Sequence, residues 1–227
     1  MEYVITPPEI VSIAVVGRTE RFPVRRIYCV GRNYMAHIRE MGGDERALPF
    51  YFTKPADAIV ATGSSIDYPP QTSNFHYECE LVAAIGKGGR DISEDAALDH
   101  VYGYAVGLDM TRRDIQIALR EKGRPWDMGK SFDQSAPCGD IHPVDQVGHF
   151  PKGNLWLKVN GETQQDTDLE LMIWNLQETI ANLSGLVELA PGDLIYTGTP
   201  EGVGPVVSGD TMLGHIDGLS DLEITVR

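Results

Sequence analysis

The sequence His76-Tyr77-Glu78-Cys79-Glu80-Leu81-Val82-Ala83-Ala84-Ile85-Gly86 decides how this chain folds. In an extended strand, side chains two residues apart lie on the same face, so Glu78 and Glu80 are predicted to point together. The uninterrupted apolar run from Leu81 to Ile85 indicates a buried strand. Two adjacent carboxylates at the entry to a buried strand repel each other and lose hydration. The pair must therefore be neutralised by a metal cation, by basic side chains or by a proton.

A third carboxylate suggests a metal site, although a salt-bridged pair of glutamates fits the same spacing. Asp109 follows the apolar run 101–108, where a strand is predicted to end. Alone it is equally consistent with a carboxylate near a helix N-terminus. With Glu78 and Glu80 it would offer hard oxygen ligands of the kind that Mg²⁺ prefers. Three carboxylates leave a divalent ion in a net negative site, so an anionic substrate needs further cations nearby. The candidates are Lys130, Lys54, Arg32 and Arg113.

Composition limits the class of protein. The chain has 227 residues and a formal net charge of -14, with 33 acidic and 19 basic residues. This excess of acid argues against nucleic acid and against an anionic membrane surface as partners. No apolar run is long enough to span a membrane, and the first residues lack a secretory signal pattern. Three cysteines without a C-x-x-C spacing indicate a reducing compartment. We therefore expect a cytoplasmic protein.

Strand and turn signals predict an α+β fold, a mixed β-roll or β-sandwich with a few short helices. Residues 1–24 are expected to form an N-terminal arm and hairpin, and residues 25–227 a single catalytic domain. Strands are predicted over 25–31, 49–53, 78–85, 101–108 and 154–159, the last entering a hairpin at Asn160-Gly161. Helices are predicted over 34–41 and over 115–122, the second behind a capping box at 111–114. A third helix is predicted along the apolar stripe 169–183. It is expected to start from a capping box at Thr167 and Glu170 and to end before Gly185.

His37 and Glu40 form a second constellation. At positions i and i+3 of a helix they share a face, and a glutamate that orients a histidine makes a general base for activating water. An ordinary exposed pair has the same spacing. The other histidines show no partner spacing and are assigned structural or surface positions. The glycine-rich loop 198–204 lacks the Gly-Lys-Ser/Thr of a phosphate-binding loop, but its backbone amides and the Thr199 hydroxyl can face an oxyanion.

These pieces together resemble the fumarylacetoacetate hydrolase family, and in particular its short, single-domain members. The matching segments occur in the family's order and cover roughly residues 25–227. They are Tyr28-Cys29-Val30-Gly31-Arg32-Asn33-Tyr34 with His37 and Glu40, Thr53-Lys54-Pro55, Glu78-Cys79-Glu80-Leu81, Gly107-Leu108-Asp109-Met110-Thr111, Arg113-Asp114-Ile115-Gln116, Lys130-Ser131-Phe132-Asp133, Pro191-Gly192-Asp193 and Gly198-Thr199-Pro200-Glu201-Gly202-Val203-Gly204.

The resemblance implies a β-roll, a homodimer and Mg²⁺, with Mn²⁺ or Ca²⁺ as alternatives, on Glu78, Glu80 and Asp109. It implies that His37 and Glu40 activate water. Residues implied to contact substrate or developing negative charge are Lys130, Gln116, Arg32, Lys54, Arg113 and Thr199. Residues 41–46 are polar and glycine-rich, and they are expected to form a mobile lid that carries the dyad.

The implied reaction is hydrolysis of the C3–C4 bond of a 2,4-dioxo acid. Segments 21–28 and 123–130 are similar to those of family members that cleave fumarylpyruvate in aromatic-acid breakdown. The expected substrate is therefore a small dicarboxylic dioxo acid, with Arg32, Arg113 and Arg124 as candidates for its second carboxylate. Three alternatives stay open. These are a generic acylpyruvase, an oxaloacetate decarboxylase or tautomerase, and a module in which metal only braces the fold.

Overall fold

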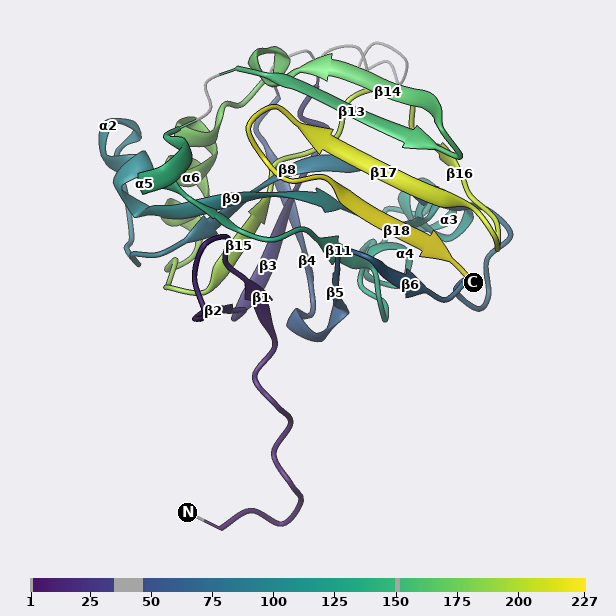
Figure 1. Cartoon of the computed structure of the whole chain (residues 1–227), viewed down its shortest axis with the longest axis horizontal. Helices are drawn as coiled ribbons and strands as arrows, with labels where there is room; N and C mark the ends of the chain where they lie inside the picture. Colours follow the sequence, from purple (N-terminus) through teal and green to yellow (C-terminus); the bar gives the residue numbers. More distant parts are fainter. Residues whose placement is uncertain (1, 35–46, 150–151) are drawn as a thin grey trace.

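The computed structural model describes residues 2–34, 47–149 and 152–227 (Figure 1). The dyad His37 and Glu40, nearly all of the expected helix 34–41 and the expected lid 41–46 lie outside these residues. Within them the chain forms mixed sheets with short helices, which confirms the predicted α+β fold class. The division into an arm and a catalytic domain remains a prediction.

Two sheets stack to form the body, with β13, β17 and β18 lying over β8 and β9 (Figure 1). The largest sheet runs, in order, β4 (Phe50–Lys54), β3 (Arg26–Gly31), β15 (Asp193–Tyr196), β8 (Cys79–Ile85), β9 (Val101–Leu108), β11 (Ala136–Cys138) and β5 (Ile59–Ala61), and β12 (His142–Pro143) also pairs with β9. The second sheet runs β14 (Glu162–Asp168), β13 (Asn154–Val159), β17 (Thr211–Ile216), β18 (Leu222–Val226) and β6 (Ser64–Ile66).

Smaller elements close the ends and edges of this body. Two small sheets are formed by β10 (Thr111–Arg112), β7 (Phe75–Tyr77) and β16 (Gly204–Pro205), and by β1 (Ser12–Ala14) with β2 (Arg21–Pro23). The described helices are α2 (Glu94–Ala97), α3 (Arg113–Glu121), α4 (Asp127–Lys130), α5 (Val144–Val147) and α6 (Leu176–Leu186), with 3-10 turns η1 (Ala56–Ala58), η2 (Leu98–His100) and η3 (Leu169–Leu171). No helix in the described ranges is both long and apolar enough to cross a membrane.

Strand β8 is buried on both faces, which explains its uninterrupted apolar sequence. Leu81 and its alternate neighbours join the core between the two stacked sheets. Val82 and Ala84 join a second core on the opposite face, which the β1–β2 hairpin helps to cover. Glu80 shares the face of Val82 because side chains alternate along a strand. The carboxylates therefore lie at the end of the second core.

The hairpin prediction at Asn160-Gly161 is confirmed. Both residues have positive φ, 52° and 85°, as a type I′ turn requires, and β13 pairs antiparallel with β14 on either side. The predicted strands 25–31, 49–53, 78–85 and 101–108 correspond to β3, β4, β8 and β9 within one residue at each end.

Both predicted capping boxes are wrong. Helix α3 has no side-chain cap, because the buried Thr111 hydroxyl donates to Asp109 O and the Asp114 carboxylate accepts from the Thr72 hydroxyl. The stripe 169–183 is not one helix. It begins as η3, and α6 starts later, behind a capping box of Asn175 and Glu178. Residues 173 and 174 are held outside the helix by hydrogen bonds to Asn33. Helix α6 also continues through Gly185 to Leu186.

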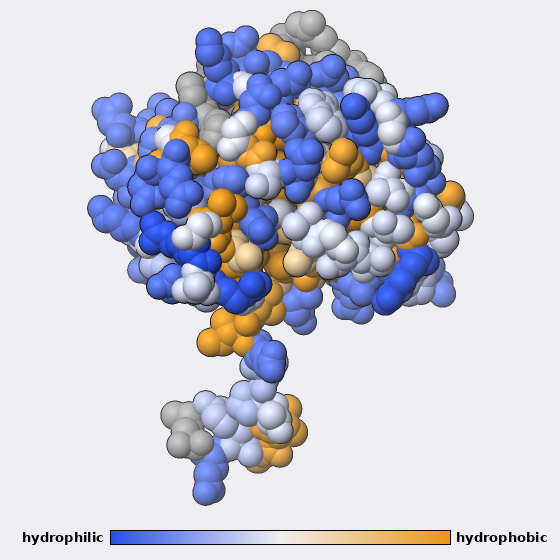
Figure 2. Space-filling model, in the orientation of Figure 1, coloured by the Kyte–Doolittle hydropathy of each residue, from blue (hydrophilic) through white to orange (hydrophobic). Residues whose placement is uncertain are grey.

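The N-terminal arm extends away from the body (Figure 1). Its exposed apolar side chains include Tyr3, Val4, Ile5 and Ile10. Orange patches on this arm stand out against the mainly hydrophilic surface of the face drawn in Figure 2. From residue 12 the chain turns into the β1–β2 hairpin, where Ile13 and Phe22 are opposite each other and buried.

Candidate active site

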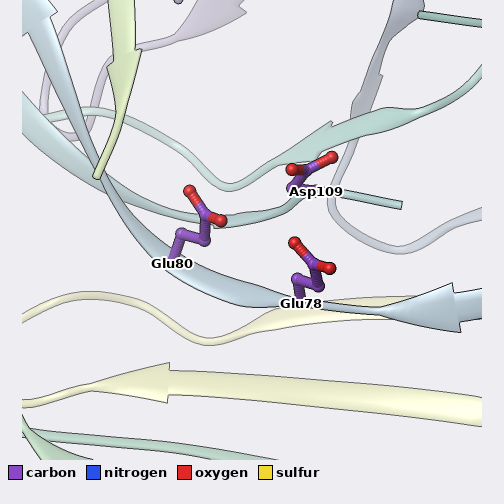
Figure 3. Close-up of side chains that lie close together, drawn as sticks. All are labelled: Glu78, Glu80 and Asp109. Atoms are coloured by element: carbon purple, nitrogen blue, oxygen red, sulfur yellow. The ribbon is translucent and has the colours of Figure 1, made fainter. Parts of the chain in front are cut away.

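The register of β8 and β9 brings the three predicted carboxylates together. Cys79 pairs with Leu108, and the Asp109 amide just beyond donates to Glu78 O at 2.8 Å. Ligand oxygens of Glu78, Glu80 and Asp109 lie within 4.8 Å of one another, and all three residues are buried (Figure 3). Gly107 stands opposite Glu80, where a Cβ would lie 2.4 Å from Val82 Cγ2. Only glycine at position 107 leaves room for the Val82 side chain on this face of the sheet.

The three carboxylates open onto a cavity of about 340 Å³. The predicted residues Arg32, Arg113, Gln116, Lys130 and Thr199 line it together with them. Lys54 lies behind Asp109 instead, with its ammonium 2.8 Å from Asp109 Oδ1. Of the two other sequence candidates, Arg124 is exposed outside the cavity, and His37 with Glu40 lies outside the described residues.

Lys130 is fully enclosed, and its ammonium is shared among three oxygens. It donates to Glu78 Oε2 at 2.7 Å, to Asp109 Oδ2 at 2.6 Å and to Thr111 Oγ1 at 2.7 Å. Burial alone would lower the pKa of Lys130, but the two carboxylates outweigh it and raise that pKa. Because an ammonium has three donors, Lys130 holds the carboxylates in place here. It must release one of them to reach a substrate oxygen.

Glu78 and Glu80 have opposite electrostatic environments. Burial would raise the pKa of Glu78, but Lys130 and Arg113 contact its two oxygens and lower that pKa. Glu80 has no basic side chain within ion-pair distance among the described residues, and it accepts from the Gly198 amide at 2.8 Å. Burial, then Asp109 and Glu78, raise its pKa well above the ordinary carboxyl value. The surroundings of Glu78 therefore favour its charged form, whereas those of Glu80 disfavour a charge unless a cation is present.

The donor set fits a divalent metal ion. Besides the uncompensated Glu80, Asp109 Oδ1 lies 2.8 Å from Lys54 Nζ without a hydrogen bond that satisfies it. A buried carboxylate oxygen left in this way is costly, and an ion ligated by it would offset the cost. Hard carboxylate oxygens suit Mg²⁺, Mn²⁺ or Ca²⁺. Glu78, Glu80 and Asp109 could therefore hold a divalent cation together.

His76 was expected to have only a structural or surface role, but it lines the cavity. Its Nε2 lies 2.7 Å from Asn74 Oδ1, and Arg113 Nε donates to its Nδ1 at 3.4 Å. Burial and the nearby Arg113 lower the pKa of His76 to about 4, so the ring is neutral at pH 7. A neutral Nδ1 can accept the hydrogen bond that steadies Arg113 against Glu78.

Two exposed arginines, Arg32 and Arg120, also line the cavity, and we call the part that they line its mouth. Burial and the neighbouring Arg120 lower the pKa of Arg32, which places the two positive charges close together. Arg32 has φ 58°, a left-handed conformation that is uncommon for residues other than glycine and is often found at functional sites. Sequence reasoning missed Arg120. Its spacing from Arg113 and Gln116, at i, i+3 and i+7 of one helix, is the signal that indicates it.

Comparison with known proteins agrees with the fold. The family described as fumarylacetoacetate (FAA) hydrolase, C-terminal, matches residues 26–227, so this chain belongs to that family. A fumarylpyruvate hydrolase of Ralstonia sp. is 52% identical over 177 residues, which are 78% of this chain and 92% of that protein. The human protein oxaloacetate tautomerase FAHD1, mitochondrial, is 43% identical over 203 residues, covering 89% and 92%.

A solved structure is also similar over nearly the full length. The crystal structure of fumarylpyruvate hydrolase from Pseudomonas aeruginosa in complex with Mn²⁺ and pyruvate superposes with a TM-score of 0.97. It is 56% identical and covers 99% of each chain. The family resemblance is thereby confirmed, a divalent metal is supported, and the chain is a carbon–carbon bond hydrolase of this family.

Proposed function

We propose that this protein hydrolyses fumarylpyruvate to fumarate and pyruvate. The observation that carries the proposal is a single cavity with carboxylates at its base and two arginines at its mouth. Arg120 lies seven residues beyond Arg113 on α3, about 10 Å of helix rise. That separation is comparable with the length of an extended seven-carbon diacid. Such a substrate presents a carboxylate at each end.

The charges of the described site favour a dianion. The carboxylates of Glu78, Glu80 and Asp109 are equal in number to the cations Lys54, Lys130 and Arg113, which contact Glu78 and Asp109. A divalent cation then adds two positive charges that a dianionic substrate can neutralise. Between the two ends, Phe52, Ile117, Trp126 and Val203 offer apolar surface for the carbon chain. A monoanion would bring no second carboxylate to the two guanidinium groups that line the cavity.

A divalent cation bound at the three carboxylates supplies Lewis-acid polarisation of the pyruvate end of the substrate. In the proposed reaction, an imidazole nitrogen of His37 takes a proton from water, and Glu40 orients that ring. The water oxygen bonds to C4, the C3–C4 bond breaks, and the pyruvate enolate takes up a proton at C3. Lys130 stabilises the negative charge of the enolate, while Gln116 and Thr199 orient the substrate.

The substrate assignment has a direct test in the second carboxylate. With a divalent cation, kcat/KM for fumarylpyruvate should exceed that for acetylpyruvate by about 10- to 150-fold, the value of one charge-assisted contact of ~1.5–3 kcal/mol. Arg120→Met should lower kcat/KM for fumarylpyruvate about 10-fold and leave acetylpyruvate nearly unchanged. Arg124→Met is the matched control, since Arg124 is exposed on the chain that follows α3 and lies outside the cavity.

Two results would count against this assignment. Equal rates on fumarylpyruvate and acetylpyruvate would show that the mouth of the cavity does not bind a second carboxylate of the substrate. An Arg120→Met variant that slows both substrates equally would place Arg120 in a general structural role. Either result leaves an acylpyruvase that does not discriminate the acyl group.

A second candidate function is oxaloacetate tautomerisation or decarboxylation. The mitochondrial oxaloacetate tautomerase is similar to this chain over 203 residues. Oxaloacetate has a pyruvate-like end that fits the same carboxylate and lysine group, and forming its enol needs no water attack on carbon. It is a four-carbon diacid, too short to reach from the base of the cavity to an arginine about 10 Å further along α3. Fumarylpyruvate therefore fits this cavity better.

We also propose Mg²⁺ as the resident ion, a place in aromatic-acid breakdown, a homodimer and a cytoplasmic location. The free cysteines Cys29, Cys79 and Cys138 are buried, and burial raises the pKa of each thiol, as expected for inert thiols in a reducing compartment. The exposed apolar side chains of the arm support association between copies. Light scattering that finds a monomer would remove the homodimer from the proposal.

A further inference from the structure

Gln165 is the one buried residue of strand β14. The β13–β14 register shifts at this point, since Leu157 pairs with Gln165 and Lys158 pairs with Thr163. Gln164 is therefore the extra residue of a β-bulge. Bulges redirect side chains and are frequent next to active sites. This bulge leaves Gln164 exposed and encloses the Gln165 amide, which is 1% exposed.

The Gln165 amide joins two segments of the active site. Its Oε1 accepts from the Cys79 amide at 3.0 Å. Its Nε2 donates to Thr199 Oγ1 at 2.9 Å and to the carbonyl oxygens of Pro200 and Glu201 at 3.1 and 3.3 Å. The Thr199 hydroxyl donates in turn to Cys79 O at 2.8 Å. Each polar atom of Gln165 is thereby satisfied inside the protein.

The segments joined by Gln165 carry different parts of the site. Cys79 stands between Glu78 and Glu80, so one end of the amide is fixed to the strand of the metal-binding carboxylates. Thr199 lines the cavity, in the loop whose Gly198 amide donates to Glu80 Oε2. The loop also passes directly over the bulge, because a Cβ on Gly202 would lie 2.1 Å from Gln164 O.

We infer that Gln165 is a positioning residue, which holds the Thr199 loop at a fixed distance from the carboxylate strand. It touches neither substrate nor metal ligand side chains, and it acts through Thr199. Strand β8 keeps its place without Gln165, because β9 pairs with it from Cys79 onward and β15 pairs with it from Val82 to Ala84. The loop has no such ladder at Thr199 within the described chain. Loss of the amide therefore loosens the loop and leaves the carboxylates in register.

The test compares Gln165→Met, which keeps length and loses both polar atoms, with Gln164→Met on the same bulge. Mn²⁺ and then pyruvate are titrated calorimetrically into each protein, and KM and kcat are measured with fumarylpyruvate. In Gln165→Met the Kd for pyruvate and the KM should rise about 10-fold, the scale of one hydrogen bond. The Kd for Mn²⁺ should stay within about 2-fold, because no carboxylate is touched. Gln164→Met should behave as wild type.

A double-mutant cycle with Thr199→Val separates positioning from general packing. If Gln165 acts through Thr199, the double variant should bind pyruvate no more weakly than the weaker single variant. Additive losses, or an unchanged pyruvate Kd in Gln165→Met, would overturn the inference. If Gln165→Met does not fold, Gln165→Asn, whose amide is one methylene too short for both contacts, takes its place with the same expected outcome. Wild-type protein that fails to bind pyruvate in Mn²⁺ would instead contradict the proposed function.

Discussion

Glu80→Gln is expected to abolish divalent-cation binding and all cation-dependent turnover, while making the metal-free protein more stable at neutral pH. Glu80 is the carboxylate without a basic partner among the described residues, and its pKa is raised by burial, Asp109 and Glu78. A raised pKa in the folded state means that stability is lost as the pH rises from the ordinary value of 4.5 toward the folded value. The Glu80→Gln protein does not lose stability in this way, because the glutamine side chain stays neutral and can still accept a hydrogen bond from the Gly198 amide.

Glu78→Gln is the matched variant, and it is expected to change the stability of the metal-free protein in the opposite direction. Its carboxylate neutralises Lys130 and Arg113, so removing that charge leaves buried cations uncompensated. We expect the metal-free Glu78→Gln protein to lose about 3 kcal/mol or more of stability. The measurements are titration calorimetry with Mg²⁺ and Mn²⁺ and thermal unfolding in chelator between about pH 5 and pH 8. Unchanged Mn²⁺ affinity in Glu80→Gln, or stability shifts of the same sign in both variants, would contradict the assignment.

His37→Ala is expected to slow hydrolysis by at least about 10²-fold, the usual scale for loss of a general base. His37 lies outside the described residues. Of the described residues just before it, Arg32 lines the cavity and Tyr34 is buried. The three described carboxylates offer metal ligands without a histidine, so Mn²⁺ affinity should be preserved in the variant.

His215→Ala provides the control for removing an imidazole. His215 lies in β17, in the second sheet, where it pairs with Asp221 at 2.6 Å and stacks on Trp156. The His215→Ala variant should hydrolyse fumarylpyruvate at the wild-type rate. Full turnover in His37→Ala would show that another group activates water.

Local patterns in the sequence predict much of the fold. Alternation along 78–85 places Glu78 and Glu80 on one face, and the end of the neighbouring strand places Asp109 beside them. Asn160-Gly161 predicts its turn, because only residues that tolerate positive φ suit it. In each case the signal and its consequence lie within a few residues of each other.

Features set by distant neighbours could not be predicted in the same way. Glu78 and Glu80 have equivalent sequence positions but opposite pKa shifts, because Lys130 and Arg113 contact Glu78 and not Glu80. The helix expected from the stripe 169–183 starts late, because Asn33 binds the backbone at 174. The burial of the Gln165 side chain depends on a β-bulge that no local sequence pattern predicts. These features require the folded chain.

The central claim is that the cavity hydrolyses a carbon–carbon bond of a dicarboxylic dioxo acid. The most direct measurement is the rate and product ratio with fumarylpyruvate, beside the rate with oxaloacetate, in Mg²⁺ and then in excess chelator. We predict that fumarate and pyruvate form in equal amounts, that fumarylpyruvate has the larger kcat/KM, and that chelator stops the reaction. A larger kcat/KM for oxaloacetate, or turnover of fumarylpyruvate that persists in chelator, would contradict the claim.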